Sequence, residues 1–186
     1  LMGSGHQQIG AALFGQDQVL SGAIVKDGKQ IRIDRPRDAI ENGIVYVSAE
    51  RKIAGLVLTQ RVAVNLVAGR YSRDKSHLLR EKRDAAIART WIDRLRIKTP
   101  SEKTIVESLS GGNQQKVILA RWLELAPDVF VLNEPTRGID VGAKSEIYRI
   151  LDDLCGEGKC VIIITSEMPE LLAMSDRIMV MFEGRV

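Results

Sequence analysis

The chain has 186 residues, of which 45% are hydrophobic and 27% are charged, enough for one globular domain with a real core. Its net charge of +3 comes from basic residues interspersed with acidic ones, which argues against a nucleic-acid-binding protein. No apolar run approaches the roughly 18 residues of a membrane span, and no signal peptide is visible, so we expect a cytosolic domain. Cys155 and Cys160 have no histidine nearby in sequence, and we expect them to be small packing groups.

The chain opens with a glycine-rich turn that leads into a helix. Gly3 and Gly5 flank Ser4 and precede apolar residues at helical spacing. Such a turn binds phosphate through backbone N–H groups and the helix amino terminus. A working phosphate loop has Lys and then Ser or Thr after its last glycine, whereas this chain has His6 and Gln7. A histidine is mostly neutral at pH 7, so a plain turn without a ligand remains an alternative.

The next segment predicts a hairpin and a buried strand. Residues 23–26 and 29–33 alternate between apolar and polar around the pair Asp27-Gly28, which is a strong hairpin signal. A proline then predicts a short helix, and residues 44–47 read as a strand.

Two charged residues, Glu50 and Arg51, follow that strand. Charged residues at the carboxyl end of a buried strand often face a ligand, although a solvated loop is the favoured interpretation here. From residue 60 to 108 the pattern becomes helical, with an amphipathic stripe over 76–95. Trp91 belongs to that stripe, and we expect it in the core or at a subdomain interface because no second aromatic residue is spaced to help it stack on a base.

The stretch from residue 109 to 134 carries the main chemical signals. Ser-Gly-Gly-Asn at 110–113 opens a helical run over 114–125, which leaves a hydroxyl and several amides free at a helix amino terminus. Residues 129–132 read as a strand buried in a parallel sheet, followed by Asn133 and Glu134. A nucleotide hydrolase needs Asp at the first of these positions for Mg²⁺ and a carboxylate at the second for water. Asn133 keeps an oxygen but loses the charge.

The remainder alternates between helix and strand. Asp140 is expected to cap a helix whose apolar positions run to residue 154, and residues 161–165 read as a second buried strand that ends at Ser166. A further helix and a strand over 178–182 complete the pattern. This alternation predicts an α/β fold with a mostly parallel sheet.

Three motifs in order resemble those of ATP-binding cassette (ABC) proteins. LSGGNQQKVILARWL resembles the signature motif, VFVLNEPTRGID the Walker B and D-loop pattern, and VIIITSEMPELLAMSDRIMVMFEGRV the segment that follows. The resemblance covers residues 1–186. It implies a P-loop NTPase-like domain, truncated at both ends, with a mostly parallel sheet flanked by helices, an antiparallel hairpin and a helical subdomain at about 60–108. Asn113 and the residues around EPTRGID and SEMPELL resemble those of the second, carboxyl-terminal cassette of bacterial monosaccharide importers of the ribose, galactose or arabinose type.

The resemblance assigns roles to matching positions. Nucleotide binding falls to Gly3, Ser4, Gly5, His6, Gln7 and Asn133; the signature turn, which contacts the γ-phosphate held by a partner cassette, is Leu109, Ser110, Gly111, Gly112 and Asn113. Glu134 matches the catalytic glutamate and Asp140 the D-loop aspartate. His6, Gln7, Asn133 and Ser166, the last at the switch histidine position, depart from the family pattern, and Ala49 lies near the Q-loop glutamine position. The Mg²⁺ site is therefore degenerate at Gln7 and Asn133.

These assignments imply an ATPase subunit that couples ATP binding and hydrolysis to sugar import. Its own half-site is expected to bind ATP and Mg²⁺ weakly, and the isolated domain to be weak or inactive, because much of the transition-state electrostatics is missing. The implied partners are a second cassette, transmembrane permease subunits and, indirectly, a periplasmic sugar-binding protein, at the cytoplasmic face of the membrane. A structural pseudo-ATPase that no longer binds nucleotide is the alternative. A non-transport cassette ATPase of DNA repair or translation is disfavoured, because repair types need a long coiled coil and the insertion here is long enough only for a helical subdomain.

Overall fold

A three-stranded parallel sheet in the order β3-β4-β5 lies at the centre of the computed structural model, which describes residues 5–74 and 80–186. The strands are β3 (Ile44–Val47), β4 (Val129–Asn133) and β5 (Cys160–Ile164). Their registers bring the carboxyl ends of all three strands to one edge of the sheet. Valine and isoleucine dominate these strands because a parallel sheet is covered on both faces. The predicted α/β fold class is therefore confirmed.

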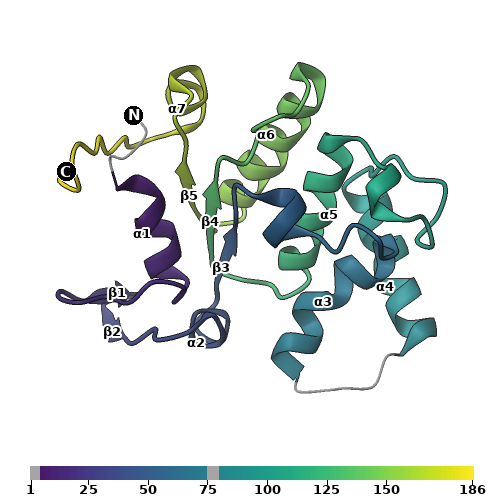
Figure 1. The fold of residues 1–186 in the computed structure, drawn as a ribbon, viewed down its shortest axis with the longest axis horizontal. Helices are drawn as coiled ribbons and strands as arrows, with labels where there is room; N and C mark the ends of the chain where they lie inside the picture. The colour runs from purple at the N-terminus through teal and green to yellow at the C-terminus, as the bar shows by residue number, and fades with distance from the viewer. Residues whose placement is uncertain (1–4, 75–79) are drawn as a thin grey trace.

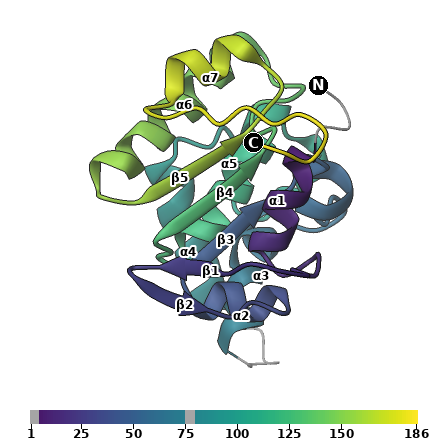
Figure 2. The same ribbon diagram turned by 90° about the vertical axis from the view of Figure 1, so that its left-hand side faces the viewer.

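Helix α1 (His6–Leu13) covers one face of this sheet (Figures 1 and 2). Gly10 makes this close approach feasible, because a Cβ atom there would lie 2.8 Å from side-chain atoms of both Tyr46 and Ile164. Any larger side chain would force the helix away from the strands. The amino terminus of α1 thus lies near the edge at which the strands end.

Helices α5 (Gly111–Leu123) and α6 (Val141–Gly156) pack on the other side of the sheet, as Figure 1 shows. The core between these layers includes Leu119, Phe130 and Leu151, all of which are buried. Burial of such side chains contributes about 1.5–3 kcal/mol each to the free energy of folding.

Helices α3 (Val62–Asp74) and α4 (Glu81–Arg94) occupy the stretch that the sequence predicts to be helical, together with the short helix η2 (Val106–Ser108). Trp91 of α4 is 7% exposed, and its indole N–H donates a hydrogen bond to Glu124 at 2.7 Å. The prediction that Trp91 lies in the core or at a subdomain interface is confirmed.

A buried guanidinium group joins α5 to its neighbours. Arg121 donates to the backbone carbonyls of Asn65 at 2.6 Å and Gly55 at 2.7 Å, and to the Asn65 side chain at 3.1 Å. Burial lowers the pKa of Arg121 to about 10. These bonds tie α5 to α3 and to the π-helical turn η1 (Arg51–Gly55), where the sequence predicts only a loop.

The predicted hairpin is formed by β1 (Ile24–Lys26) and β2 (Lys29–Ile31), which pair antiparallel. Asp27 and Gly28 have φ angles of 51° and 73°, the left-handed conformation that a two-residue hairpin turn requires. The hairpin and the short helix α2 (Pro36–Glu41) lie together at one end of the molecule (Figure 2).

Asp128 links this hairpin to the sheet through ion pairs, so its contribution to the stability of the fold should depend on pH. It accepts a hydrogen bond from Lys26 at 3.0 Å, which, with a weaker contribution from Lys159, lowers the pKa of Asp128. Such a carboxylate stabilises the fold above its unfolded-state pKa, and the contribution is lost as pH falls through the lowered folded-state pKa. Asp128→Asn should cost about 0.5 kcal/mol in urea unfolding at pH 7, and the difference from the wild-type protein should vanish in strong acid. An equal difference at both pH values would contradict this ion-pair role.

Two expectations about the carboxyl-terminal part are wrong. No strand forms over 178–182, and Phe182 makes only one bridge, to Arg185, because no described strand lies alongside to pair with this segment. Four of its apolar side chains are exposed instead, namely those of Ile178, Met179, Val180 and Phe182. After α7 (Met168–Met174), the predicted last strand is therefore missing from the sheet in the described part of the chain.

Cys155 and Cys160 are exposed instead of packed. They lie near the end of α6 and at the start of the outermost described strand, where little covers them. In the described part of the chain, no helix combines the length and apolarity that crossing a membrane would require.

Candidate nucleotide site

The phosphate-loop positions lie at the amino terminus of α1. Gly5 precedes the helix with a φ of 90°, a left-handed conformation that glycine adopts without strain, in agreement with the predicted glycine turn. His6 is half-buried and Gln7 is exposed in the first turn. Gly3 and Ser4, the other two predicted phosphate contacts, lie outside the described residues. The described part of this loop therefore has the predicted turn-to-helix geometry but no lysine.

Asn133 ends strand β4 in a buried position. It is 4% exposed, and its amide Nδ2 donates to the hydroxyl of Tyr46 on β3 at 3.0 Å. Its Oδ1 atom is buried and has no hydrogen-bond partner among the described residues. This oxygen is a neutral acceptor at the position where the family pattern places a carboxylate.

Glu134 and Ser166 meet at the edge of the sheet although 32 positions separate them. One Glu134 carboxylate oxygen accepts hydrogen bonds from the Ser166 amide at 3.0 Å and the Ser166 hydroxyl at 2.9 Å. The backbone of Glu134 has a φ of 48°, a left-handed conformation that residues other than glycine rarely adopt. Such strained residues cluster at functional sites. Its backbone amide donates to Ile164 at 2.7 Å, which anchors this turn to β5. The parallel register thus brings the predicted catalytic and switch positions into direct contact.

The signature turn lies at the amino terminus of α5. Ser110 is exposed and precedes the helix without a side-chain cap, and the first backbone bond of the helix runs from Gln114 N to Ser110 O at 2.9 Å. The amides before Gln114 therefore have no carbonyl acceptor within the helix. Leu109 packs against the core, and a Cβ atom on Gly112 would lie 2.4 Å from the Cβ of Ala143, so only glycine allows this contact.

A cavity of about 220 Å³ adjoins this turn. Its lining joins the signature turn to the start of α6 and comprises Lys98, Ser110, Gly112, Asn113, Asp140, Gly142, Ala143 and Glu146. Asp140 caps α6, as predicted, by accepting a hydrogen bond from the Ala143 amide at 2.9 Å. The predicted signature and D-loop positions therefore share one concave surface.

Arg51 packs against the signature turn at Gly111, although the sequence favours a solvated loop for it. One terminal nitrogen lies 3.0 Å from where a Cβ of Gly111 would be, and the other donates to the Arg137 carbonyl at 3.4 Å. Burial lowers the pKa of Arg51, and no carboxylate pairs with it in the part of the chain that the structure describes. The available signal was its position after a buried strand, which does not reveal how deeply a side chain packs.

The phosphate-loop helix and the signature helix lie on opposite sides of the sheet, α1 on one and α5 on the other (Figure 1). The two predicted phosphate-contacting turns therefore begin helices that pack on different faces of the sheet.

The residues present could hold Mg²⁺ only if phosphate oxygens supplied further ligands to the ion. Among the described residues, no three His, Cys, Asp or Glu side chains are grouped to hold a metal. Mg²⁺ is bound in nucleotide sites by one or two protein oxygens, phosphates and water. The Oδ1 atom of Asn133, which has no partner among the described residues, and the exposed amide of Gln7 lie at the two positions where the sequence predicts a degenerate Mg²⁺ site.

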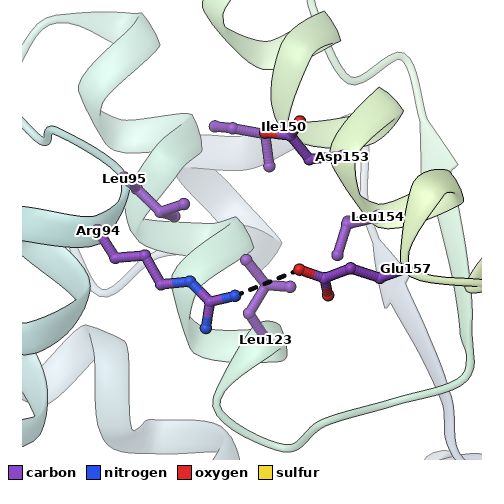
Figure 3. Close-up of a pocket in the computed structure, with 7 residues that line it drawn as sticks. All are labelled: Arg94, Leu95, Leu123, Ile150, Asp153, Leu154 and Glu157. Atoms are coloured by element: carbon purple, nitrogen blue, oxygen red, sulfur yellow. Dashed lines mark ion pairs between the residues drawn. The ribbon is translucent and has the colours of Figure 1, made fainter.

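Another cavity, of about 390 Å³, lies between α4, α5 and α6 (Figure 3). An ion pair between Arg94 and Glu157 at 3.5 Å spans it. None of the residues predicted for nucleotide binding lines this cavity, which therefore lies outside the candidate site.

Sequence comparisons agree with this geometry. The model of the family described as ABC transporter matches residues 2–137. Across its whole length the chain is 46% identical to a ribose import ATP-binding protein of Clostridium perfringens (strain SM101 / Type A) and 46% to a xylose import ATP-binding protein of Thermoanaerobacter pseudethanolicus. It is 44% identical to an L-arabinose transport ATP-binding protein of Geobacillus stearothermophilus. The chain spans only 37–38% of the length of these relatives.

Solved structures share the fold. A nucleotide-free ATP-binding cassette from an ABC transporter aligns with a TM-score of 0.86 at 22% identity, over 100% of this chain and 75% of that one. A dimeric cassette in a post-hydrolysis state, bound to ADP and Pi, aligns with a TM-score of 0.77 at 18% identity, over 98% of this chain and 78% of that one. With the family model matching well over half of its residues, the chain belongs to the ABC transporter family.

Proposed function

We propose that the chain is an ATP-binding cassette of a bacterial sugar importer, and that its signature turn completes the nucleotide site of a partner cassette. Its own half-site binds ATP weakly and hydrolyses it poorly. The relatives named for ribose, xylose and arabinose import support the sugar assignment, and their greater length is consistent with this chain being the carboxyl-terminal one of two cassettes.

The observation that carries this proposal is the difference between the two half-sites. At the signature turn, the Ser110 hydroxyl is exposed and the first amides of α5 lack helical acceptors. On the other side of the sheet, Asn133 supplies no charge, and Glu134 is held by Ser166. Phosphoryl transfer depends mainly on groups that stabilise charge, so loss of these groups impairs one half-site and spares the other.

At the partner's nucleotide, the signature turn acts as a cluster of donors. Ser110 and the amides of α5 donate hydrogen bonds to the γ-phosphate, each contributing about 1.5–3 kcal/mol, and the helix amino terminus adds a favourable dipole. Arg51, packed against Gly111, adds positive charge beside them. Asp140 holds the start of α6 in place next to the turn.

In the chain's own half-site, Gln7 and Asn133 would hold Mg²⁺. The ion supplies neutralisation of phosphate charge when it is bound. Glu134 is placed to accept a proton from, or orient, an attacking water, although its Oε1 atom already accepts two hydrogen bonds from Ser166. The weak activity proposed for this side follows from these two features.

The proposed partners are a second cassette, in the same polypeptide or as a dimer mate, and transmembrane permease subunits. A periplasmic sugar-binding protein would act through the permease. The chain then lies at the cytoplasmic face of the membrane, with the segment 60–108, which holds α3 and α4, as its helical subdomain.

Glu134→Gln tests the asymmetry. In the complete transporter we expect less than about a twofold fall in steady-state ATP hydrolysis, because the partner half-site carries the flux. A true general base lost from the working site would cost about 10²–10⁴-fold. Phosphate release is the measurement, and Glu157→Gln, an exposed change outside the candidate site, is the matched control. A hundredfold loss specific to Glu134→Gln would show that this half-site is the active one.

A structural pseudo-ATPase remains the second candidate, favoured by the neutral Asn133 and the occupied carboxylate of Glu134. Calorimetric titration of Mg-ATP separates the two functions. Weak binding that strengthens when the partner cassette is present supports the proposed function, whereas absence of any binding in both cases supports the pseudo-ATPase.

A further inference from the structure

We infer that Asn113 is a positioning residue for the signature serine: it holds the Ser110 hydroxyl so that its proton is free for the nucleotide phosphate. This inference rests on the proposed function of the signature turn. It concerns how that turn is prepared before a nucleotide arrives.

The hydrogen bonds of Asn113 fix the orientation of its side-chain amide. The backbone N–H of Lys98 donates to Asn113 Oδ1 at 2.8 Å. A backbone N–H is only a donor, so the oxygen of the amide must face Lys98 and the nitrogen must face the other way. Asn113 Nδ2 then donates to the Ser110 Oγ atom at 2.8 Å.

This arrangement determines what the serine hydroxyl can do. A hydroxyl has one proton to donate and two lone pairs that accept. In Ser110 one lone pair is taken by Asn113, and the oxygen makes no capping bond to the amides of α5. The proton therefore points away from Asn113, and the exposed hydroxyl is prepared as a donor. A phosphate oxygen is an acceptor, which is the partner that such a hydroxyl needs.

The charges around the adjoining cavity are compatible with this role. Both acidic residues in its lining are engaged, Asp140 by the Ala143 amide and Glu146 by Lys116 at 2.7 Å. The bond from Lys116 lowers the pKa of Glu146, so it stays an ion-paired carboxylate. Lys98 lines the same cavity, is exposed and adds a positive charge.

The length of the asparagine side chain suits this double contact. Asn113 lies three positions after Ser110, and its short side chain reaches both the serine and Lys98. A glutamine has one more C–C bond, about 1.5 Å, and would have to fold its side chain back to keep both hydrogen bonds in place. Asparagine at this position therefore orients the Ser110 hydroxyl before a nucleotide binds.

A double-mutant cycle on the complete transporter tests the inference. The variants are Ser110→Ala, Asn113→Ala and the double variant, and the readouts are kcat and KM for ATP hydrolysis. We expect Ser110→Ala to lower kcat about 10- to 100-fold and Asn113→Ala about three- to tenfold. Because Asn113 acts through Ser110, adding Asn113→Ala to Ser110→Ala should change kcat less than about twofold.

Thr99→Val is the matched control, because it removes a hydrogen bond of the same loop, from Thr99 to the Ser101 carbonyl at 3.0 Å, without touching Ser110. It should leave kcat within about twofold of the wild-type value. Equal losses from Asn113→Ala in both backgrounds, or no loss in the wild-type background, would overturn the positioning role and leave the proposed function intact. If Ser110→Ala itself has no effect, the proposed function of the turn fails, and this inference fails with it.

Discussion

Replacing Ser110 by arginine should abolish ATP hydrolysis by the complete transporter, with a loss of at least about 100-fold in kcat. The substitution removes the hydroxyl donor, and it places a long side chain in front of the exposed amino terminus of α5. The adjoining cavity of about 220 Å³ is small enough for an arginine to fill much of the space that a γ-phosphate needs. Steady-state phosphate release is the measurement.

Thr90→Arg is the control for adding an arginine. Thr90 is exposed on α4, and its hydroxyl donates to the Ala86 carbonyl of its own helix, so this change should leave hydrolysis within about twofold of the wild-type rate. Hydrolysis that persists in Ser110→Arg would mean that the signature turn of this chain serves no nucleotide, and the proposed division between the half-sites would have to be abandoned.

Arg121→Met should give the largest loss of stability. Its guanidinium satisfies the Asn65 and Gly55 carbonyls and the Asn65 side chain. Methionine fills similar space but removes the guanidinium donors to the two buried carbonyls, at a cost of about 1–3 kcal/mol for each, whereas Asn65 Oδ1 still accepts from the Val57 amide at 2.8 Å. We expect a total loss of about 3 kcal/mol in the free energy of unfolding, and a fall of about 6–12 °C in Tm.

Arg121→Lys should recover little of that loss, because an ammonium group does not reproduce a planar fork of donors. Arg89→Met is the surface control, since Arg89 is 62% exposed, and should change stability by no more than about 0.5 kcal/mol. The lowered pKa of Arg121, about 10, still lies above neutral pH. The guanidinium group is therefore charged at neutral pH, with all its N–H donors available to these acceptors. Full stability in Arg121→Lys would show that charge alone is needed there.

Local sequence signals predicted the elements that short-range chemistry decides. Asp27-Gly28 predicts a hairpin because few residues tolerate the left-handed turn, and the structure has that turn. The Asp140 cap was predictable in the same way, since a helix amino terminus favours a side chain that accepts from its free amides.

Contacts between distant segments were not predictable from these signals. The bond between Glu134 and Ser166 depends on the register of β4 against β5, and no pattern within either segment records that register. The half-burial of Arg51 depends on how η1 packs against the signature turn. The strand expected at 178–182 has suitable residues, but a strand also requires a neighbour, and none of the described strands pairs with it.

The placement of α1 and α5 on opposite sides of the sheet has a thermodynamic consequence. If two such cassettes share each nucleotide, ATP binding and the association of the cassettes form one linked equilibrium. Each nucleotide bound across the junction adds RT ln(1 + [ATP]/Kd) to the stability of the pair, which is about 2.7 kcal/mol when ATP exceeds its Kd a hundredfold. A side that binds ATP weakly contributes little to that sum. The pair would then open first at the impaired side while the other junction stays closed.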